Sequence, residues 1–153
     1  MKYETVTGPF SAFYDPMKAI YDELMAKHGG DFDKVRAEMP KVNYVVSSLP
    51  KYIREALGTM AESLWFSAED FAKQLNHHPE LTITEYANVF NKIKDCTEIY
   101  ESGALKVALI TEYERPYVVI LKTTGNHSEA YIVSLHTSRS GYLKRIRKHK
   151  RLC

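Results

Sequence analysis

The stretch that decides the fold runs from residue 97 to residue 136, TEIYESGALKVALITEYERPYVVILKTTGNHSEAYIVSLH. It contains four runs in which β-branched and aromatic residues recur with a period close to two, as expected for β-strands. These runs are residues 97–102, 105–113, 117–124 and 130–136. Only short turns separate them, and short turns join antiparallel neighbours. The stretch therefore predicts a four-stranded antiparallel β-meander.

Helical patterns dominate the residues before this stretch. A capping pattern at Asp15–Pro16 predicts a helix over residues 15–28, and a second helix is expected over residues 31–39. We expect these helices to form a helical appendage over residues 1–48, followed by the main domain over residues 49–153.

Two further helices are expected just before the meander. Ser67, with Asp70 three residues later, approximates a capping box and opens a helix over residues 68–77. Thr82 or Thr84 caps the next helix. The expected fold class is α+β, with N-terminal helices, a four-stranded antiparallel meander and a basic C-terminal helix.

Composition limits the class of protein. The chain of 153 residues is 44% hydrophobic and 12% aromatic, which is enough for one folded domain with a sizeable core. It has two cysteines, no long apolar run and no charged-then-apolar N-terminus of the signal-peptide type. These features predict a cytoplasmic protein, and a protein carried in a virion or delivered into a cell would show the same composition.

The basic residues gather at the C-terminal end. From Arg139 onward the chain carries seven Lys or Arg and no acid, although its net charge is only +2. Residues 140–150 predict a basic helix with Leu143 and Ile146 facing inward. Such a concentration suits a polyanion such as RNA or DNA, or an acidic protein, and a solvated helix face is the alternative.

Two adjacent histidines, His77 and His78, end the predicted helix just before Pro79. Neighbouring helical side chains project about 100° apart, so the pair is poorly placed to bind one metal ion. No H-E-x-x-H, C-x-x-C, P-loop or G-x-S-x-G motif occurs. What remains is acid–base chemistry without a metal or cofactor, for which His77, His78, His127 and His136 are candidates. Alternatively, His77 only completes the helix end, where the dipole favours a cation.

His136 has the neighbours that phosphodiester cleavage requires. It ends the last strand between Ser134 and the segment Thr137–Arg139. Cleavage by a 2′-hydroxyl needs a base, an acid and donors for the charge that develops on phosphorus. The segment therefore indicates a phosphodiesterase site, although a single histidine at a strand end also suits a structural role.

Two segments resemble the phage-associated branch of the barnase–EndoU–colicin–RelE-like (BECR fold) nucleases. They are FSAEDFAKQLNHHPELTITEY at residues 66–86 and YVVILKTTGNHSEAYIVSLHTSRSGYLKRIRK at residues 117–148. Members of that branch have a helix ending in a His-His-Pro-Glu-type signature. Their meander has a Lys leaving its third strand and a Ser-Leu-His-type segment in its last. The resemblance covers residues 49–150.

The resemblance implies a metal-independent ribonuclease that cuts RNA by transesterification to a 2′,3′-cyclic phosphate. It also implies a phage, prophage or toxin setting, with an inhibitor protein as a partner. The functional residues it points to are His77, His78, Lys122, Ser134, His136, Ser138 and Arg139. The charge pattern adds four cations expected to contact the RNA backbone, namely Lys144, Arg145, Arg147 and Lys148.

The expected strand register separates two of these residues. A turn at Asn126–His127 places Lys122 opposite Tyr131 and His136 opposite Tyr117. Five residues of strand lie between those levels, or about 16 Å at the usual rise. Lys122 and His136 are therefore not expected to contact the same phosphate.

The sequence thus predicts an endoribonuclease, with RNA, possibly including tRNA, as its substrate. His136 is the preferred proton carrier, and His78 is the second acid or base. The rival hypothesis keeps the fold without the chemistry, because a fold alone does not guarantee activity. In that case the protein is a binding module of a phage or mobile element that grips a host protein or nucleic acid.

Overall fold

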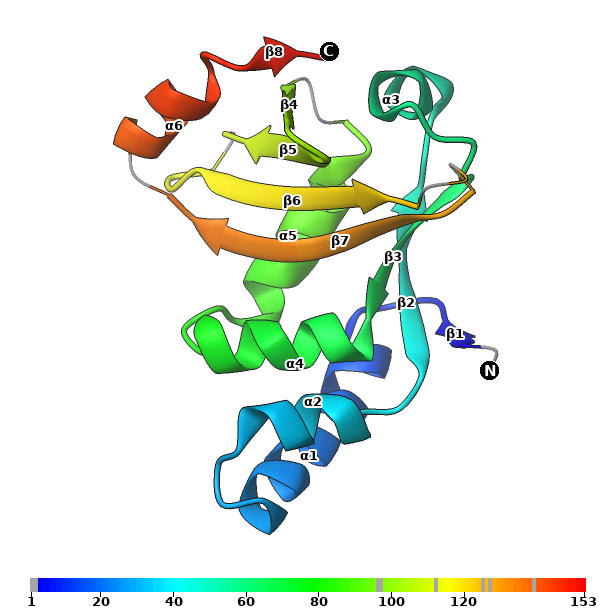
Figure 1. Cartoon of the computed structure of the whole chain (residues 1–153), viewed down its shortest axis with the longest axis vertical. Coiled ribbons are helices and arrows are strands. Elements are labelled where there is room, and N and C mark those ends of the chain that lie inside the picture. The colour runs from blue at the N-terminus through cyan, green and yellow to red at the C-terminus, as the bar shows by residue number, and fades with distance from the viewer. Residues whose placement is uncertain (1–2, 96–97, 112, 125, 127, 139) are drawn as a thin grey trace.

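A mixed β-sheet of eight strands organises the described part of the chain, which comprises residues 3–95, 98–111, 113–124, 126, 128–138 and 140–153 of the computed structural model (Figure 1). The strands are β1 (Glu4–Val6), β2 (Val42–Ser48), β3 (Ser63–Ser67), β4 (Ile99–Ser102), β5 (Leu105–Ile110), β6 (Tyr117–Thr123), β7 (Ala130–Thr137) and β8 (Lys150–Arg151). The helices are α1 (Ser11–Lys27), α2 (Phe32–Glu38), α3 (Lys51–Leu57), α4 (Ala68–His77), α5 (Ile83–Ile93) and α6 (Ser140–Ile146).

The prediction of N-terminal helices followed by a four-stranded antiparallel sheet is wrong. The sheet has the order β1-β2-β3-β7-β6-β5-β4-β8, and the expected meander, β4 to β7, is only one half of it. Two pairs are parallel, β1 with β2 and β3 with β7, and the other pairs are antiparallel. The predicted helical appendage, residues 1–48, supplies β1 and β2 to the same sheet.

Parallel pairing explains why the sequence did not predict that β1, β2 and β3 belong to the sheet. β3 and β7 pair through Leu64 with Ala130 and Trp65 with Tyr131, although more than 60 residues separate them in the chain. A tight turn between strands signals an antiparallel neighbour, whereas a parallel neighbour needs a long crossover and leaves no local pattern. These strands were therefore not assigned to the sheet in the sequence analysis.

A β-bulge changes the register in the middle of β7. Ile120 pairs with Ser134 but Leu121 pairs with Ile132, so Val133 is an additional residue. Lys122 lies opposite Tyr131 as predicted, whereas His136 lies opposite Val118 and not Tyr117. The bulge also shifts the alternation of side chains by one position. Ile132 and Leu135 therefore both face the core.

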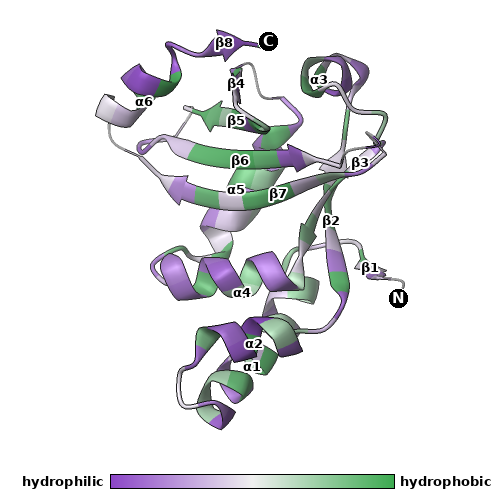
Figure 2. Ribbon diagram, viewed as in Figure 1, coloured by the Kyte–Doolittle hydropathy of each residue, from purple (hydrophilic) through white to green (hydrophobic). Residues whose placement is uncertain are grey.

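The inner face of the sheet packs on α1, α4 and α5 (Figure 1), and the hydrophobic residues of these elements are green in Figure 2. A cluster of aromatic rings lies at the centre of this core. Phe10, which precedes α1, lies with its ring centroid 5.0 to 6.1 Å from six other rings. These are Phe13, Tyr14, Tyr44, Phe71, Tyr86 and Phe90. They come from α1, β2, α4 and α5. A residue near the N-terminus therefore joins the helices and the sheet.

The same packing sets the start of α1. The helix begins at Ser11, earlier than the predicted Asp15, and Pro16 lies inside it. Phe13 and Met17 are buried in the core. The burial of Phe10 and Phe13 thus selects a helix start that the capping residues alone do not indicate.

The outer face of the sheet carries a smaller core under α6. Leu143 and Ile146 of α6 pack on Tyr100, Val107, Leu109 and Val118, so both face inward as predicted. The helix is shorter than expected, because it ends at Ile146 and residues Lys150–Arg151 pair with β4 as β8. α6 covers β4 to β6, and its start lies beside the end of β7 (Figure 1).

Replacing Phe10 by Ala should lower the free energy of unfolding by about 3–5 kcal/mol, because a large buried ring is lost from the cluster. Chemical denaturation followed by circular dichroism would measure it. Met60→Ala is the control, since Met60 is 78% exposed, and its effect should stay within about 0.5 kcal/mol. An unfolding curve in which residues 49–153 remain folded after loss of Phe10 would contradict this account of the core.

Candidate functional site

A pocket of about 830 Å³ opens at the end of β7. Its lining comes from the loop before β6, the end of β7 and the start of α6, and consists of Arg115, His136, Thr137, Ser138, Gly141, Tyr142 and Arg145. Two guanidinium groups and an imidazole thus face one cavity, and no acidic side chain lines it among the described residues. The pocket suits an anion.

The antiparallel pairing of β6 with β7 assembles this lining. Thr137 at the end of β7 pairs with Tyr117 at the start of β6. The backbone N–H of Ser138 donates to the carbonyl of Pro116 over 3.1 Å. Arg115, which precedes Pro116, is therefore brought beside the residues that follow His136.

His78 approaches His136 from α4. The two ring centroids are 5.6 Å apart, and the ring planes make an angle of 25°. His78 is the C-cap of α4, whereas His136 lies near the end of β7, and both are half-buried. The pair therefore joins two elements that are distant in the chain.

The hydrogen bonds of the two rings define which nitrogen is available. His136 Nδ1 lies 3.1 Å from the carbonyl oxygen of Thr137, which can only accept, so Nδ1 carries the proton of this bond. His78 Nδ1 lies 3.4 Å from a carboxylate oxygen of Glu80, so the same reasoning applies to its weaker contact. In the neutral tautomers the Nε2 atoms are then the proton acceptors.

His77 lies apart from this pair. Its side chain is exposed, and its ring centroid is 6.1 Å from that of Phe32 on α2. Adjacent helical residues project in different directions, so only His78 contacts His136. The structure therefore separates the roles of the two adjacent histidines.

Tyr142 and Arg145 add an aromatic and cationic wall to the pocket. The ring of Tyr142 meets that of His136 edge to face, with centroids 5.8 Å apart. The guanidinium of Arg145 lies 5.7 Å from the centroid of the Tyr142 ring, within cation–π range. Tyr142 thus contacts both His136 and Arg145.

Lys122 and Ser134 lie outside this pocket. Lys122 lines a separate pocket of about 260 Å³, together with Asp70 and Tyr131. Ser134 lies two positions before His136 on β7 and pairs with Ile120. Ser138, in contrast, lines the main pocket beside His136. Predicted Arg139 and His127 lie outside the described residues.

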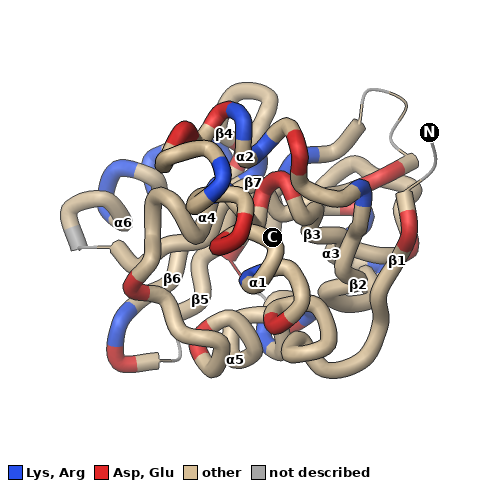
Figure 3. The backbone as a smooth tube through the Cα atoms, turned by 90° about the horizontal axis from the view of Figure 1, so that it is seen from below, with Lys and Arg blue, Asp and Glu red and all other residues tan. Residues whose placement is uncertain are grey.

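The basic residues of the C-terminal segment, which are blue in Figure 3, differ in their partners. Lys144 and Lys148 are exposed and form no ion pair with any residue in the described part of the chain. Arg147 instead donates from Nε and Nη2 to the carboxylate of Glu98, over 2.9 and 3.0 Å. Arg147 therefore anchors the end of α6 beside β4, which is a different role from the one predicted from charge.

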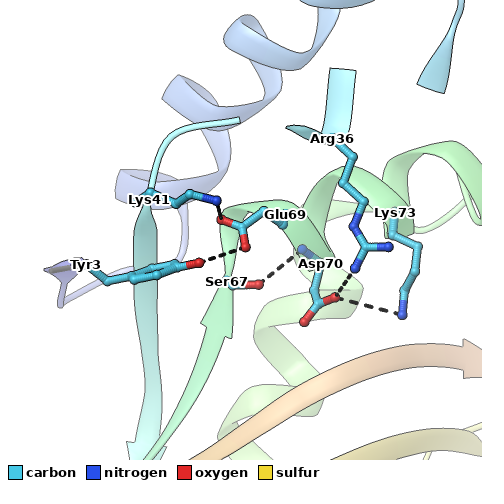
Figure 4. Close-up of polar contacts among 7 residues, drawn as sticks. All are labelled: Tyr3, Arg36, Lys41, Ser67, Glu69, Asp70 and Lys73. Carbon is cyan, nitrogen blue, oxygen red and sulfur yellow. Dashed lines mark hydrogen bonds and ion pairs between the residues drawn. The ribbon is translucent and has the colours of Figure 1, made fainter. Parts of the chain in front are cut away.

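A polar cluster fastens the start of α4 to the N-terminal part of the chain (Figure 4). Tyr3 Oη donates to Glu69 over 2.9 Å, and Lys41 Nζ lies 3.5 Å from the same carboxylate. Arg36 Nη2 donates to Asp70 over 3.2 Å. Burial raises the pKa of Asp70. These charges are used in holding α4 in place.

Gln74, in the middle of α4, is bonded to β7. Its Nε2 donates to the carbonyl of Leu135 over 2.6 Å, and its Oε1 accepts from the N–H of Leu135 over 3.0 Å. Both groups are buried. The pairing of β3 with β7 ends at Trp65 and Tyr131. At Leu135 the Gln74 amide therefore makes the two hydrogen bonds that a neighbouring strand would otherwise make.

Three residues of this arrangement were missed by the sequence analysis. Arg115 sits in a turn between two strands, and antiparallel pairing brings that turn to the end of β7. Tyr142 follows the strand by a few residues and resembles an ordinary core aromatic. Gln74 had a signal, because it lies three residues after Phe71 on the apolar face of the helix, where a polar residue is unusual.

Comparison of the chain with models of protein families, with curated proteins and with solved structures found no match. Within the described residues, no three His, Cys, Asp or Glu side chains are grouped so that they could hold a metal ion. The helices of that same part of the chain include none with the length and apolar character needed to cross a membrane.

The Glu98–Arg147 pair gives stability a defined pH dependence. The hydrogen bond from Arg147 holds the pKa of Glu98 below its usual range. The pair therefore makes its full contribution to the free energy of unfolding above the pKa that Glu98 has in the unfolded chain. This contribution is lost as the pH falls through the lower pKa of Glu98 in the folded protein. When the pH is lowered from about 6 to about 3, the free energy of unfolding should fall less in Glu98→Gln than in wild type. The difference should be at most about 1 kcal/mol, because Arg147 is partly exposed.

Thermal unfolding at the two pH values checks this prediction. Glu55→Gln is the matched control, because Glu55 lies on the surface in a long contact of 3.9 Å with Lys51. An identical acid response of Glu98→Gln and wild type would show that the pair does not act in this way.

Proposed function

We propose that the protein is a metal-independent ribonuclease that cuts RNA by transesterification at the pocket lined by His136, beside which His78 lies. The observation that carries the proposal is the meeting of two imidazoles, from α4 and β7, beside a pocket that contains Arg115 and Arg145. One imidazole can take a proton while the other gives one, and the cations attract the phosphate.

The chemistry follows from what such groups can do. The Nε2 of one histidine removes the proton of the ribose 2′-hydroxyl, and the 2′-oxygen attacks the neighbouring phosphorus. The bond from phosphorus to the 5′-oxygen breaks, and the other histidine, protonated, gives its proton to that oxygen. The products are a 2′,3′-cyclic phosphate and a 5′-hydroxyl. Arg115, Arg145 and the hydroxyl of Thr137 or Ser138 stabilise the charge on the phosphorane oxygens.

Substitution of either histidine tests the proposal. In excess EDTA, His136→Ala and His78→Ala should each cut total RNA or a tRNA pool about 10²- to 10⁴-fold more slowly than wild type. His28→Ala is the matched control, because His28, the C-cap of α1, pairs with Glu38 at the end of α2 and does not line the pocket. Its rate should equal that of wild type, and the wild-type products should carry cyclic phosphate ends.

If the folded wild-type protein does not cut varied RNAs, the proposal of a ribonuclease is wrong. The remaining hypothesis would then be the binding module, in which the same cationic pocket holds a nucleic acid or an acidic protein without reacting. The inhibitor protein implied by the resemblance stays a prediction in either case.

The two unpaired lysines should determine how affinity depends on salt. Each phosphate contact contributes a slope of about −0.7 in log K against log salt for single strands. The double substitution Lys144→Ala with Lys148→Ala should therefore reduce the magnitude of the slope by about 1.4. Fluorescence anisotropy with an oligonucleotide resistant to cleavage measures it. Lys34→Ala with Lys51→Ala, on other surfaces, should leave the slope unchanged.

A further inference from the structure

We infer that Gln74 is a positioning residue of this site, which holds the two histidines at their working separation without contacting the substrate. The inference rests on the proposed function, since it concerns the same pair of rings. It goes beyond that proposal because Gln74 belongs to the core and lines no part of the pocket among the described residues.

Gln74 bonds to both histidine-bearing segments. Its backbone carbonyl accepts the N–H of His78 over 2.7 Å, the i to i+4 hydrogen bond that closes α4, so its side chain lies one turn before His78. Its side-chain amide makes both hydrogen bonds of Leu135, the residue directly before His136. Gln74 is thus hydrogen-bonded to His78 itself and to Leu135, the residue next to His136 in the chain. The side-chain amide therefore links α4 to β7 close to both rings.

Burial makes the bridge specific. Gln74 is 1% exposed, and Leu135 is fully buried. A buried N–H and C=O without partners are costly, so α4 and β7 are held at the spacing that satisfies both groups. An apolar side chain could fill the same volume on this face of α4, but it would leave α4 free to slide along the edge of β7. The amide therefore determines position as well as packing.

Tyr86, a second neighbour of the Gln74 amide, provides a variant that removes a buried polar group without removing the bonds to Leu135. The hydroxyl of Tyr86 is buried and lies beside the Gln74 side chain. Burial raises the pKa of Tyr86, and the nearby Gln74 side chain opposes that rise. Tyr86→Phe removes this hydroxyl and leaves both bonds to Leu135 intact. It should therefore change neither the spacing of the histidines nor the rate of cleavage.

The first variant is Gln74→Leu, which loses both bonds at similar volume. If Gln74 positions the histidines, kcat should fall by about 10- to 100-fold, because a displacement of about 1 Å has an effect of that size. KM should stay unchanged, because Arg115 and Arg145 are not on α4. Asn76→Leu is the matched control, since Asn76 is an exposed amide on the same helix.

The second variant, Gln74→Glu, makes the test reversible and covers the case in which Gln74→Leu fails to fold. An ionised carboxylate accepts from the N–H of Leu135 but cannot donate to its carbonyl, whereas a protonated carboxyl does both. Burial raises the pKa of such a carboxyl. The spacing of the rings should therefore be disturbed at about pH 8 and restored at about pH 5.

The readout independent of activity is the nuclear Overhauser effect between ring protons of His78 and His136. It should be present in wild type, Tyr86→Phe and Asn76→Leu, and weak or lost in Gln74→Leu. In Gln74→Glu it should reappear as the pH is lowered. This measurement needs no RNA, so it separates the position of the rings from the reaction.

Two results would have different meanings. If wild type does not cut RNA but the ring contact depends on Gln74 as described, the proposed function fails and the positioning role stands. If the ring contact persists in both Gln74 variants, or Gln74→Leu keeps the ring contact and the wild-type kcat, the positioning role is overturned.

Discussion

The short parallel pairing of β3 with β7 is the constraint on which the rest of the structure depends. Leu64–Ala130 and Trp65–Tyr131 join the three N-terminal strands to the five that follow. Because β3 ends at Ser67 and α4 begins at the next residue, the helix must leave the sheet beside β7. α4 then runs along the edge that β3 has left, and its C-cap residue, His78, comes to the end of β7. The site is a result of this geometry.

The sequence predicted the elements whose signals are local. The strands within residues 99–137 and the helices that follow Ser67 and Thr82 have alternation, amphipathic spacing and capping residues, all of which act over a few positions. β2 and β3 lack that information, because their partners are selected by contacts formed between distant parts of the chain. The buried Phe10 similarly overrode the capping pattern at Asp15–Pro16, because aromatic burial contributes more free energy than a helix cap.

For the candidate site, the sequence identified the two histidines better than the groups around them. Histidines are rare enough for His78 and His136 to attract attention, and the structure places their rings together. Arg115 could not be distinguished from other surface arginines, since its relation to His136 depends on strand pairing. The charge pattern also treated Arg147 as equivalent to Lys144, although one pairs with Glu98 and the other is exposed. Charge alone does not show which cations have partners.

One additional residue in β7 decides on which face of the sheet His136 lies. With strict alternation, His136 would share the inner face with Ala130 and Ile132, and Leu135 would point outward. Val133 reverses this relation for every residue after it, so that Leu135 is buried and His136 reaches the outer face. Deletion of one residue within the strand would therefore turn His136 away from the pocket, although the histidine itself would still be present. Among chains that share this site, the spacing from Ile132 to His136 should vary less than the identity of residue 133.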